Sequence, residues 1–272
     1  MNNRKITFIG AGNMTRSIIA GLVASGYPAN KITATNPSTA KLNELKRSFA
    51  IHTSCDNIEA SAAADVIVLA VKPQIMATLG EQLQSLDLSG KLVISIAAGI
   101  QCARLSEMFG QTLQMVRVMP NTPSLIGQGM SGLFATENVT AADRDYASYL
   151  MDAVGKTCWV STESEINNVI AAAGSAPAYF FLFMEAMQSE AVAQGFDQQT
   201  ARELVQQAAL GAAQMVVANP DVDLATLLTQ VTSKGGTTAE ALKTFNEHQL
   251  ASIVAKSMQA AVKRAEEMEA LF

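Results

Sequence analysis

The chain has 272 residues, which is enough for one large domain or two domains of ordinary size. Apolar residues make up 49% and charged residues 16%, so a sizeable core is available and an intrinsically disordered chain is excluded. The net charge of −5, with no long run of Lys or Arg, argues against nucleic acid or an anionic membrane surface as the main partner.

The cysteines and histidines bear on the compartment and on metal binding. Cys55, Cys102 and Cys158 lie far apart and form no CxxC pair, which fits reduced thiols better than disulfides or zinc ligands. The two histidines, His52 and His248, have no metal-ligand spacing to other candidates. A strand-like run from residue 6 argues against a signal peptide. We therefore expect a cytoplasmic protein without a metal.

The first part of the chain alternates strand and helix signals. Apolar runs predict buried strands over residues 6–9, 32–35, 66–71, 92–97 and 115–119, with helices over 14–24 and 41–49 between them. Strands over 129–135 and 157–160 follow, with a helix near 141–154. This alternation predicts an α/β fold, in which residues 1–162 form a Rossmann-like domain with a mainly parallel sheet.

The second part of the chain, residues 163–272, is rich in Ala, Gln, Met and Leu and predicts an all-helical domain. Helix-length segments cover residues 163–173, 178–194, 198–218, 223–231 and 238–271, with stops at Gly195 and Asn219-Pro220. The run over 169–184 is almost wholly apolar, but it is shorter than the roughly 20 residues of a membrane span and contains Pro177. We therefore expect a buried core or interface helix there, not a membrane helix.

A glycine-rich turn follows the first predicted strand. Gly10, Ala11, Gly12, Asn13 and Met14 stand between that strand and a helix, the context of a dinucleotide fingerprint. Gly10 allows the tight turn, Gly12 lets the backbone approach a pyrophosphate, and the helix N-terminus offers free N–H groups. Thr15 replaces the third glycine, so we expect a slightly wider helix–strand spacing. An ordinary glycine turn is the alternative, and the strand–helix alternation downstream favours the dinucleotide.

The end of the second strand indicates which dinucleotide is used. Enzymes that use NAD usually place Asp or Glu there, whereas this chain has Asn36, Pro37 and Ser38 and no acid. Neutral donors tolerate a 2′-phosphate that a carboxylate would repel, so we predict NADPH as the preferred cofactor, with NADH as a second donor. The same residues also suit a turn and helix cap.

Three later strand ends carry unusual sequences at the edge where such sheets bind ligands. They are Ala70-Val71-Lys72-Pro73, the segment with Ala97, Ala98 and Gly99, and the segment Met119-Pro120-Asn121-Thr122-Pro123. The prolines fix the backbone direction, and the small residues leave room for a flat ring. For Lys72 we prefer cofactor contact or a surface position to a catalytic role.

Two segments of the helical part are further candidates. Gly174, Ser175 and Pro177 interrupt an apolar helix, which fits either a ligand contact or a packing kink. Ser233-Lys234-Gly235-Gly236 precedes Thr237 and Glu240, whose spacing is that of a capping box and predicts a helix start. A Gly-Gly turn before a helix start suits a carboxylate, although a plain interhelical turn would contain the same residues.

Taken together, these motifs resemble the pyrroline-5-carboxylate reductase family over nearly the whole chain. The carriers are GAGNM at 10–14, AVKP at 70–73, SIAAG at 95–99, MPNTP at 119–123, GSAPAYFFLFMEAM at 174–187 and TSKGGTT at 232–238. The resemblance implies reduction of 1-pyrroline-5-carboxylate to L-proline, the last step of proline biosynthesis. It also implies a helical dimerisation domain, in a homodimer or a higher oligomer of dimers.

The resemblance also implies roles for individual residues. The dinucleotide would be lined by Gly10, Ala11, Gly12, Asn13, Met14, Asn36, Pro37, Ser38, Asn57, Ala70, Val71, Lys72, Pro73, Ala97, Ala98, Gly99 and Asn121. The substrate carboxylate and ring would be held by Ser175, Ser233, Gly236 and Thr237, and Thr238 would hydrogen-bond the ring nitrogen. Lys234 departs from the usual SPGGTT and would loosen the loop or add a positive charge.

Two other functions are considered. Dehydrogenases of the β-hydroxyacid type also join a Rossmann domain to helices, but they use a Lys that residues 174–187 lack. A non-catalytic dinucleotide sensor would be favoured by loss of the small-residue strand ends or of the Gly-Gly-Thr-Thr loop, and both are intact.

Overall fold

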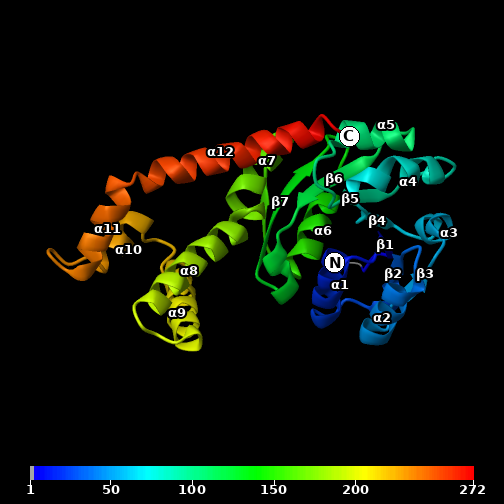
Figure 1. Cartoon of the computed structure of the whole chain (residues 1–272). Helices are drawn as coiled ribbons and strands as arrows, with labels where there is room; N and C mark the ends of the chain where they lie inside the picture. The colour runs from blue at the N-terminus through cyan, green and yellow to red at the C-terminus, as the bar shows by residue number, and fades with distance from the viewer. Residues whose placement is uncertain (1–2) are drawn as a thin grey trace. The chain divides into compact units, whose positions relative to one another are not determined.

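A computed structural model describes residues 3–272 (Figure 1). Residues 1–2, with which the predicted dinucleotide-binding domain begins, lie outside the described residues. The chain forms two compact units, of which the first ends at Ser175 but also includes Ala261–Phe272. The second unit is Ala176–Ala260, so the last helix belongs partly to each unit.

The first unit is built on an eight-stranded sheet in the order β3-β2-β1-β4-β5-β6-β7-β8. The strands are β1 (Ile6–Ile9), β2 (Ile32–Thr35), β3 (His52–Ser54), β4 (Val66–Leu69), β5 (Leu92–Ser95), β6 (Gln114–Met119), β7 (Gly129–Ala135) and β8 (Gly155–Trp159). Neighbouring strands are parallel except β6 and β7. The predicted Rossmann-like, mainly parallel sheet is therefore confirmed.

Helices cover both faces of this sheet (Figure 1). They are α1 (Asn13–Ala24), α2 (Thr39–Phe49), α3 (Asn57–Ala62), α4 (Met76–Leu83), α5 (Cys102–Phe109) and α6 (Ala141–Asp152). Alternate strand residues point to opposite faces, so Phe8 and Val68 pack with α1, α2 and α6. Ile67 and Val93 point the other way and pack with α4 and α5. Both faces are buried, as a parallel sheet requires.

The strand predictions were incomplete in two respects. Strand β3 has no apolar run, because it is a three-residue strand at the sheet edge with His52 exposed, and it was missed. Strands β4 and β5 end at Leu69 and Ser95, two residues before the predicted ends. The residues beyond them leave the hydrogen-bonded ladder and form the turns at the carboxyl edge.

The second unit is helical. It contains α8 (Ala176–Ala193), α9 (Gln198–Ala218), α10 (Leu224–Gln230), α11 (Thr237–Glu247) and the first part of α12 (Leu250–Glu269). The predicted stops at Gly195 and Asn219-Pro220 are confirmed, but the single helix predicted over 238–271 is wrong. The helix is interrupted at His248 and Gln249, where Gln249 adopts a left-handed φ of 55°. Neither Gly nor Pro marks this interruption, so the sequence pattern predicts one continuous helix across it.

The segment Glu165–Ala193 joins α7 (Glu165–Val169), a π-helical turn over Ile170–Gly174 and α8. By length and composition alone it could cross a membrane, and little of it is buried within the chain. Phe180, Phe181 and Leu182 on α8 are 62–68% exposed. A contiguous apolar surface of this kind marks a site of contact with another protein or a membrane.

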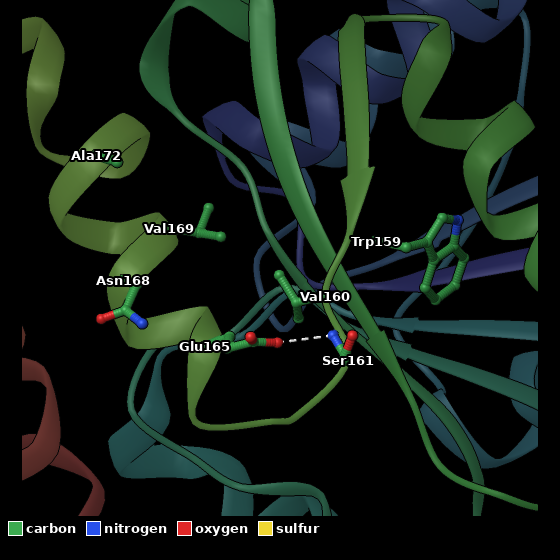
Figure 2. A pocket seen from close by; sticks show the side chains of 7 residues that line it. All are labelled: Trp159, Val160, Ser161, Glu165, Asn168, Val169 and Ala172. Carbon is green, nitrogen blue, oxygen red and sulfur yellow. Dashed lines mark hydrogen bonds between the residues drawn. The ribbon is translucent and has the colours of Figure 1, made fainter.

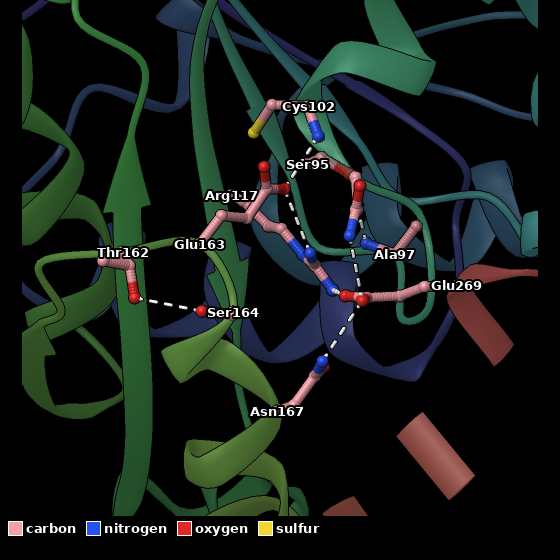
Figure 3. A network of polar contacts seen from close by, with 10 residues as sticks. Ser95, Ala97, Cys102, Arg117, Thr162, Glu163, Ser164, Asn167 and Glu269 are labelled. Carbon is pink, nitrogen blue, oxygen red and sulfur yellow. Dashed lines mark hydrogen bonds and ion pairs between the residues drawn. The ribbon is translucent and has the colours of Figure 1, made fainter. Parts of the chain in front are cut away.

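A buried network of ion pairs and hydrogen bonds connects distant segments of the first unit (Figure 3). Arg117, in the middle of β6, is 1% exposed, and its Nη1 lies 3.0 Å from Glu163 Oε1. Its Nη2 lies 2.9 Å from Glu269 Oε1 without hydrogen-bond geometry, and neither atom has a hydrogen-bond partner among residues 3–272. Gln101 and Asn167 donate to Glu269 Oε2, and the Cys102 N–H donates to Glu163 Oε1. The network thus ties β6 to the segment before α7 and to the last turn of α12.

These neighbours stabilise the ionised form of the Glu269 carboxyl group. Burial raises the pKa of its carboxyl, but the hydrogen bonds from Asn167 and Gln101 and the positive charge of Arg117 outweigh burial and hold the pKa below the ordinary 4.5. A carboxyl whose native pKa is lowered stabilises the fold above its unfolded pKa. That contribution is lost as the pH falls below 4.5 and through the lowered native value.

We predict that Arg117→Met lowers the free energy of unfolding by about 3 kcal/mol or more, because it leaves two carboxylates without their cation. The measurement is urea unfolding followed by the fluorescence of Trp159, at fixed protein concentration. Arg264→Met, which breaks an exposed pair with Glu267, is the control and should change the same quantity by less than about 1 kcal/mol. Equal losses in the two variants would contradict a central role for Arg117.

Candidate active site

The carboxyl ends of four strands meet at one edge of the sheet. The Gly10 N–H donates to the Thr35 carbonyl at 2.9 Å, which links the ends of β1 and β2. The Ala70 N–H donates to the Ile9 carbonyl at 2.9 Å, and the Ile96 N–H to the Leu69 carbonyl at 3.1 Å. The predicted dinucleotide segments after β1, β2, β4 and β5 are therefore brought together. They flank the switch point between β1 and β4, where such sheets bind ligands.

The turn after β1 has the geometry that a pyrophosphate needs. Gly10 has a φ of +109°, and a Cβ there would lie 2.5 Å from the Ala70 carbonyl oxygen, so only glycine fits. At Gly12 a Cβ would meet no protein atom within 4 Å, which leaves open space beside the start of α1. Gly12 caps α1 without a side-chain bond, so the first N–H groups of α1 are free for an anion. The residues present thus fit a dinucleotide.

Thr15, which replaces the third glycine, has a definite function in this turn. Its side chain is fully buried, and Oγ1 donates to the Gly10 carbonyl at 2.7 Å. The hydroxyl therefore ties the first turn of α1 to the glycine turn. The remaining predicted residues of this segment differ in exposure, because Ala11 is buried, Met14 is half-buried and Asn13 is exposed.

The turn after β2 is polar and carries no carboxylate. Asn36 Nδ2 donates to the Ser38 carbonyl at 3.1 Å and to Ser38 Oγ at 3.0 Å. Ser38 stands at the N-cap of α2 but makes no side-chain cap bond, so the N–H groups of α2 stay free near Pro37. Asn57 lies close by, because its Oδ1 accepts from Thr35 Oγ1 at 2.7 Å. A 2′-phosphate would meet neutral and N–H donors here.

The segments after β4 and β5 differ in their surroundings. Lys72 is exposed and forms no salt bridge among the described residues, whereas Val71 and Pro73 are half-buried. After β5, Ala97 is buried, Ala98 is half-buried, and Gly99 has a φ of +73°. A Cβ on Gly99 would lie 3.1 Å from Met268 Cβ, so the end of α12 packs directly on this segment. The contact with Met268 had no signal in the sequence.

Asn121 and Ser175 lie in neighbouring parts of the first unit. Asn121 follows β6, is 8% exposed, and donates from Nδ2 to the Ala173 carbonyl at 3.0 Å. Ser175 follows the π-helical turn, and its N–H donates to the Ile170 carbonyl at 2.7 Å. The sequence predicted both residues as site candidates, but not the bond that connects their segments.

The turn before α11 lies in the second unit and has an uncapped helix start. The Gly236 N–H donates to the Ser233 carbonyl at 3.0 Å, and Gly235 has a φ of +71°. Helix α11 begins at Thr237, as predicted, but the capping box of Thr237 and Glu240 does not form. Gly236 occupies the N-cap instead and makes no side-chain cap bond. The N–H groups of the first turn therefore remain available, beside the exposed hydroxyl-bearing residues Thr237 and Thr238.

A cavity of about 360 Å³ lies elsewhere in the first unit, beside β8 and α7 (Figure 2). Its lining consists of Trp159, Val160, Ser161, Glu165, Asn168, Val169 and Ala172, none of which is a predicted site residue. Glu165 accepts the backbone N–H groups of Ser161 and Thr162, and these bonds lower its pKa. Its carboxylate is engaged in capping the turn.

The described residues favour neither a metal centre nor a cysteine nucleophile. In the part of the chain that the structure describes, no group of three or more His, Cys, Asp or Glu could hold a metal ion. Burial, and then the nearby Glu163, raise the pKa of the Cys102 thiol, which is the opposite of what a nucleophile needs.

The fold and the strand-end site define a dinucleotide-dependent oxidoreductase. Residues 5–99 match the family model described as NADP oxidoreductase, coenzyme F420-dependent, and residues 163–268 match pyrroline-5-carboxylate reductase dimerisation. The chain is 67% identical to a pyrroline-5-carboxylate reductase of Vibrio alginolyticus over the full length of both chains. It belongs to the pyrroline-5-carboxylate reductase family, and the predicted family and oxidoreductase class are confirmed.

Solved structures give the same result. A pyrroline-5-carboxylate reductase from Coxiella burnetii is 42% identical, with a TM-score of 0.94 over 98% of this chain and 99% of that chain. A Plasmodium falciparum pyrroline carboxylate reductase, solved with NADP bound, is 28% identical, with a TM-score of 0.86 over 99% of both chains.

We predict that Asn36→Asp shifts the ratio of kcat/KM for NADPH over NADH towards NADH by about tenfold or more, because a carboxylate repels a 2′-phosphate. Steady-state kinetics with each dinucleotide measure the ratio. Asn30→Asp adds the same charge in the exposed turn that precedes β2, at the opposite end of that strand, and should leave the ratio unchanged. A wild-type enzyme that clearly favours NADH would show that the β2 turn has been misinterpreted.

Proposed function

We propose that the chain reduces the C=N bond of 1-pyrroline-5-carboxylate to L-proline, with NADPH as preferred donor and NADH as a second donor. The family membership supports the reaction, and the neutral turn after β2 supports NADPH. The observation that carries the substrate assignment is the uncapped start of α11. Its free N–H groups and helix dipole suit a carboxylate, which is the only charged group the substrate presents at high pH.

The substrate is held, in this proposal, by residues from two segments of the chain. The turn Ser233–Gly236 and Thr237 bind the carboxylate, and Lys234 in the same turn adds a positive charge near an anionic ligand. Ser175 contacts the carboxylate or the ring. The close approach of Gly236 supports this arrangement, since a Cβ there would lie 2.4 Å from Ser233 Oγ. A side chain at this position would have to displace the Ser233 hydroxyl, which is one of the proposed substrate contacts.

The dinucleotide site uses the strand-end segments. Gly10 to Met14 hold the pyrophosphate, and Asn36 to Ser38 with Asn57 hold the adenosine end. The segments Ala70–Pro73 and Ala97–Gly99 and the residue Asn121 line the nicotinamide side. When bound, the dinucleotide supplies a hydride to the imine carbon.

The chain itself supplies orientation and a hydrogen bond at nitrogen. Reduction of C=N needs one hydride at carbon and one proton at nitrogen, and a cyclic imine can be protonated by solvent near neutral pH. No strong acid is then required, which agrees with the absence of His from the predicted site. The Thr238 hydroxyl accepts from the protonated nitrogen and fixes the ring plane. Positioning of the reacting atoms provides most of the effect.

We also propose that residues 163–272 form the substrate-binding and dimerisation domain of a homodimer, from which a higher oligomer can be built. The exposed side chains of α8 support a protein partner, because Phe180, Phe181 and Leu182 are mostly exposed in the single chain. A second copy of the chain would cover this surface, so the apolar segment need not enter a membrane. The acidic composition argues against a nucleic-acid partner, and the scattered cysteines support a cytoplasmic protein.

Thr238→Val tests the proposed role of the hydroxyl. We expect kcat to fall about tenfold, which corresponds to one hydrogen bond of about 1.4 kcal/mol in the transition state, with NADPH affinity unchanged. Thr244→Val is the matched control, since Thr244 lies on the same helix and its Oγ1 donates to the Glu240 carbonyl of that helix. Undiminished kcat in folded Thr238→Val would remove this residue from the mechanism.

A further inference from the structure

Asn121 links strand β7 to the π-helical turn Ile170–Gly174 through both ends of its side-chain amide. Oδ1 accepts from the Met130 N–H at 2.9 Å, and Nδ2 donates to the Ala173 carbonyl at 3.0 Å. The residue stands at an N-cap but makes no side-chain cap bond, so the amide serves these two backbone groups instead. At 8% exposed it is largely shielded from water, and both bonds are correspondingly costly to lose.

The Ala173 carbonyl needs an outside donor because of the sequence that follows. In an α-helix this carbonyl would accept from residue 177, which is Pro177 and has no N–H. The chain before it forms a π-helical turn over Ile170–Gly174, closed by the bond from the Ser175 N–H to the Ile170 carbonyl. Turns of this kind occur frequently at functional sites. Asn121 thus satisfies a carbonyl that the proline has freed.

The same contact fixes the segment that carries Ser175. Ala173 lies two residues before Ser175, and a Cβ on Gly174 would lie 3.4 Å from Met119 Cε, so the turn also packs on the end of β6. The strand-end loop Met119–Asn121 and the Ser175 turn therefore form one rigid connection. Any rotation of the turn about the helix axis would break the Asn121 bond.

We propose that Asn121 is a positioning residue that sets the orientation of Ser175. It does so by donating a hydrogen bond to the Ala173 carbonyl, for which Pro177 has no N–H. The proposal rests on the proposed function, in which Ser175 binds the substrate. Asn121 acts through Ser175, and its amide is not required to touch the reacting atoms. An Asn is suited to this task, because it offers a donor and an acceptor at opposite sides of one planar group.

Asn121→Asp tests this hydrogen bond at about pH 8, where a carboxyl is ionised. The carboxylate still accepts from Met130 but repels the Ala173 carbonyl. We expect KM for 1-pyrroline-5-carboxylate to rise about tenfold, as for the loss of one buried hydrogen bond, while the Kd of NADPH rises by a clearly smaller factor, since Asn121 also lines the proposed nicotinamide site. Asn138→Asp is the control, because Asn138 also donates to a backbone carbonyl, that of Leu113, and accepts from Thr136, but at the opposite end of β6 from Asn121. Its kinetics should equal those of the wild type.

A double-mutant cycle separates positioning from a general structural role. If Asn121 acts through Ser175, Asn121→Asp should raise KM no further when Ser175→Ala is already present. Effects that add in full, wild-type kinetics in Asn121→Asp, or an equal loss of NADPH affinity would each overturn the proposal. Ser175→Ala without effect would instead refute the proposed role of Ser175, and the positioning role with it.

Pro177→Ala probes the same hydrogen bond from the helix side and covers the case in which Asn121→Asp does not fold. It restores an N–H that competes for the Ala173 carbonyl, so folding is retained while the turn relaxes towards a regular α-helix. We expect KM for the imine to rise several-fold, to about the level of one weakened hydrogen bond. An unchanged KM in this variant would overturn the proposal.

Discussion

The arrangement of the first unit depends on the burial of one charge. Arg117 is buried in the middle of a strand, where an unpaired guanidinium would lower the stability of the fold by several kcal/mol. Carboxylates from segments far away in the sequence must therefore pack against it. Glu163 arrives from the segment after β8, and Glu269 from the last turn of α12. Met268, the neighbour of Glu269 in α12, packs against Gly99 in the turn after β5. An ion network that touches no proposed reactant thus adjoins, and helps to hold, a proposed cofactor segment.

The site itself relies on backbone groups that regular structure leaves free. The N–H groups at the starts of α1 and α11 have no side-chain caps, which leaves them available for phosphate and carboxylate. The Ala173 carbonyl is freed by Pro177 and bound by Asn121. Few titratable side chains are involved, and this suits a reaction in which the substrate can take its proton from water. Orientation is then the main contribution of the protein.

The sequence predicted the parts of this structure that depend on local pattern. Buried parallel strands read as apolar runs, and parallel strands share a carboxyl edge, so the clustering of Gly10, Ala70 and Ala97 followed from topology. Strand β3 was not predicted because it is short and polar. The interruption at Gln249 was not predicted because no Gly or Pro marks it. Arg117 and Asn121 depend on partners 46 and 52 residues away, which no local pattern reveals. A lone Arg inside an apolar strand was the available signal for the first of them.

All of these features serve one proposed reaction, the transfer of hydride from a nicotinamide dinucleotide to a cyclic imine. The direct measurement mixes purified protein with 1-pyrroline-5-carboxylate and NADPH or NADH, and follows both the absorbance of the reduced dinucleotide and the L-proline formed. We expect equal amounts of dinucleotide oxidised and L-proline produced, with faster turnover on NADPH than on NADH. Absence of turnover with both dinucleotides, in protein shown to be folded, would contradict the proposed reaction.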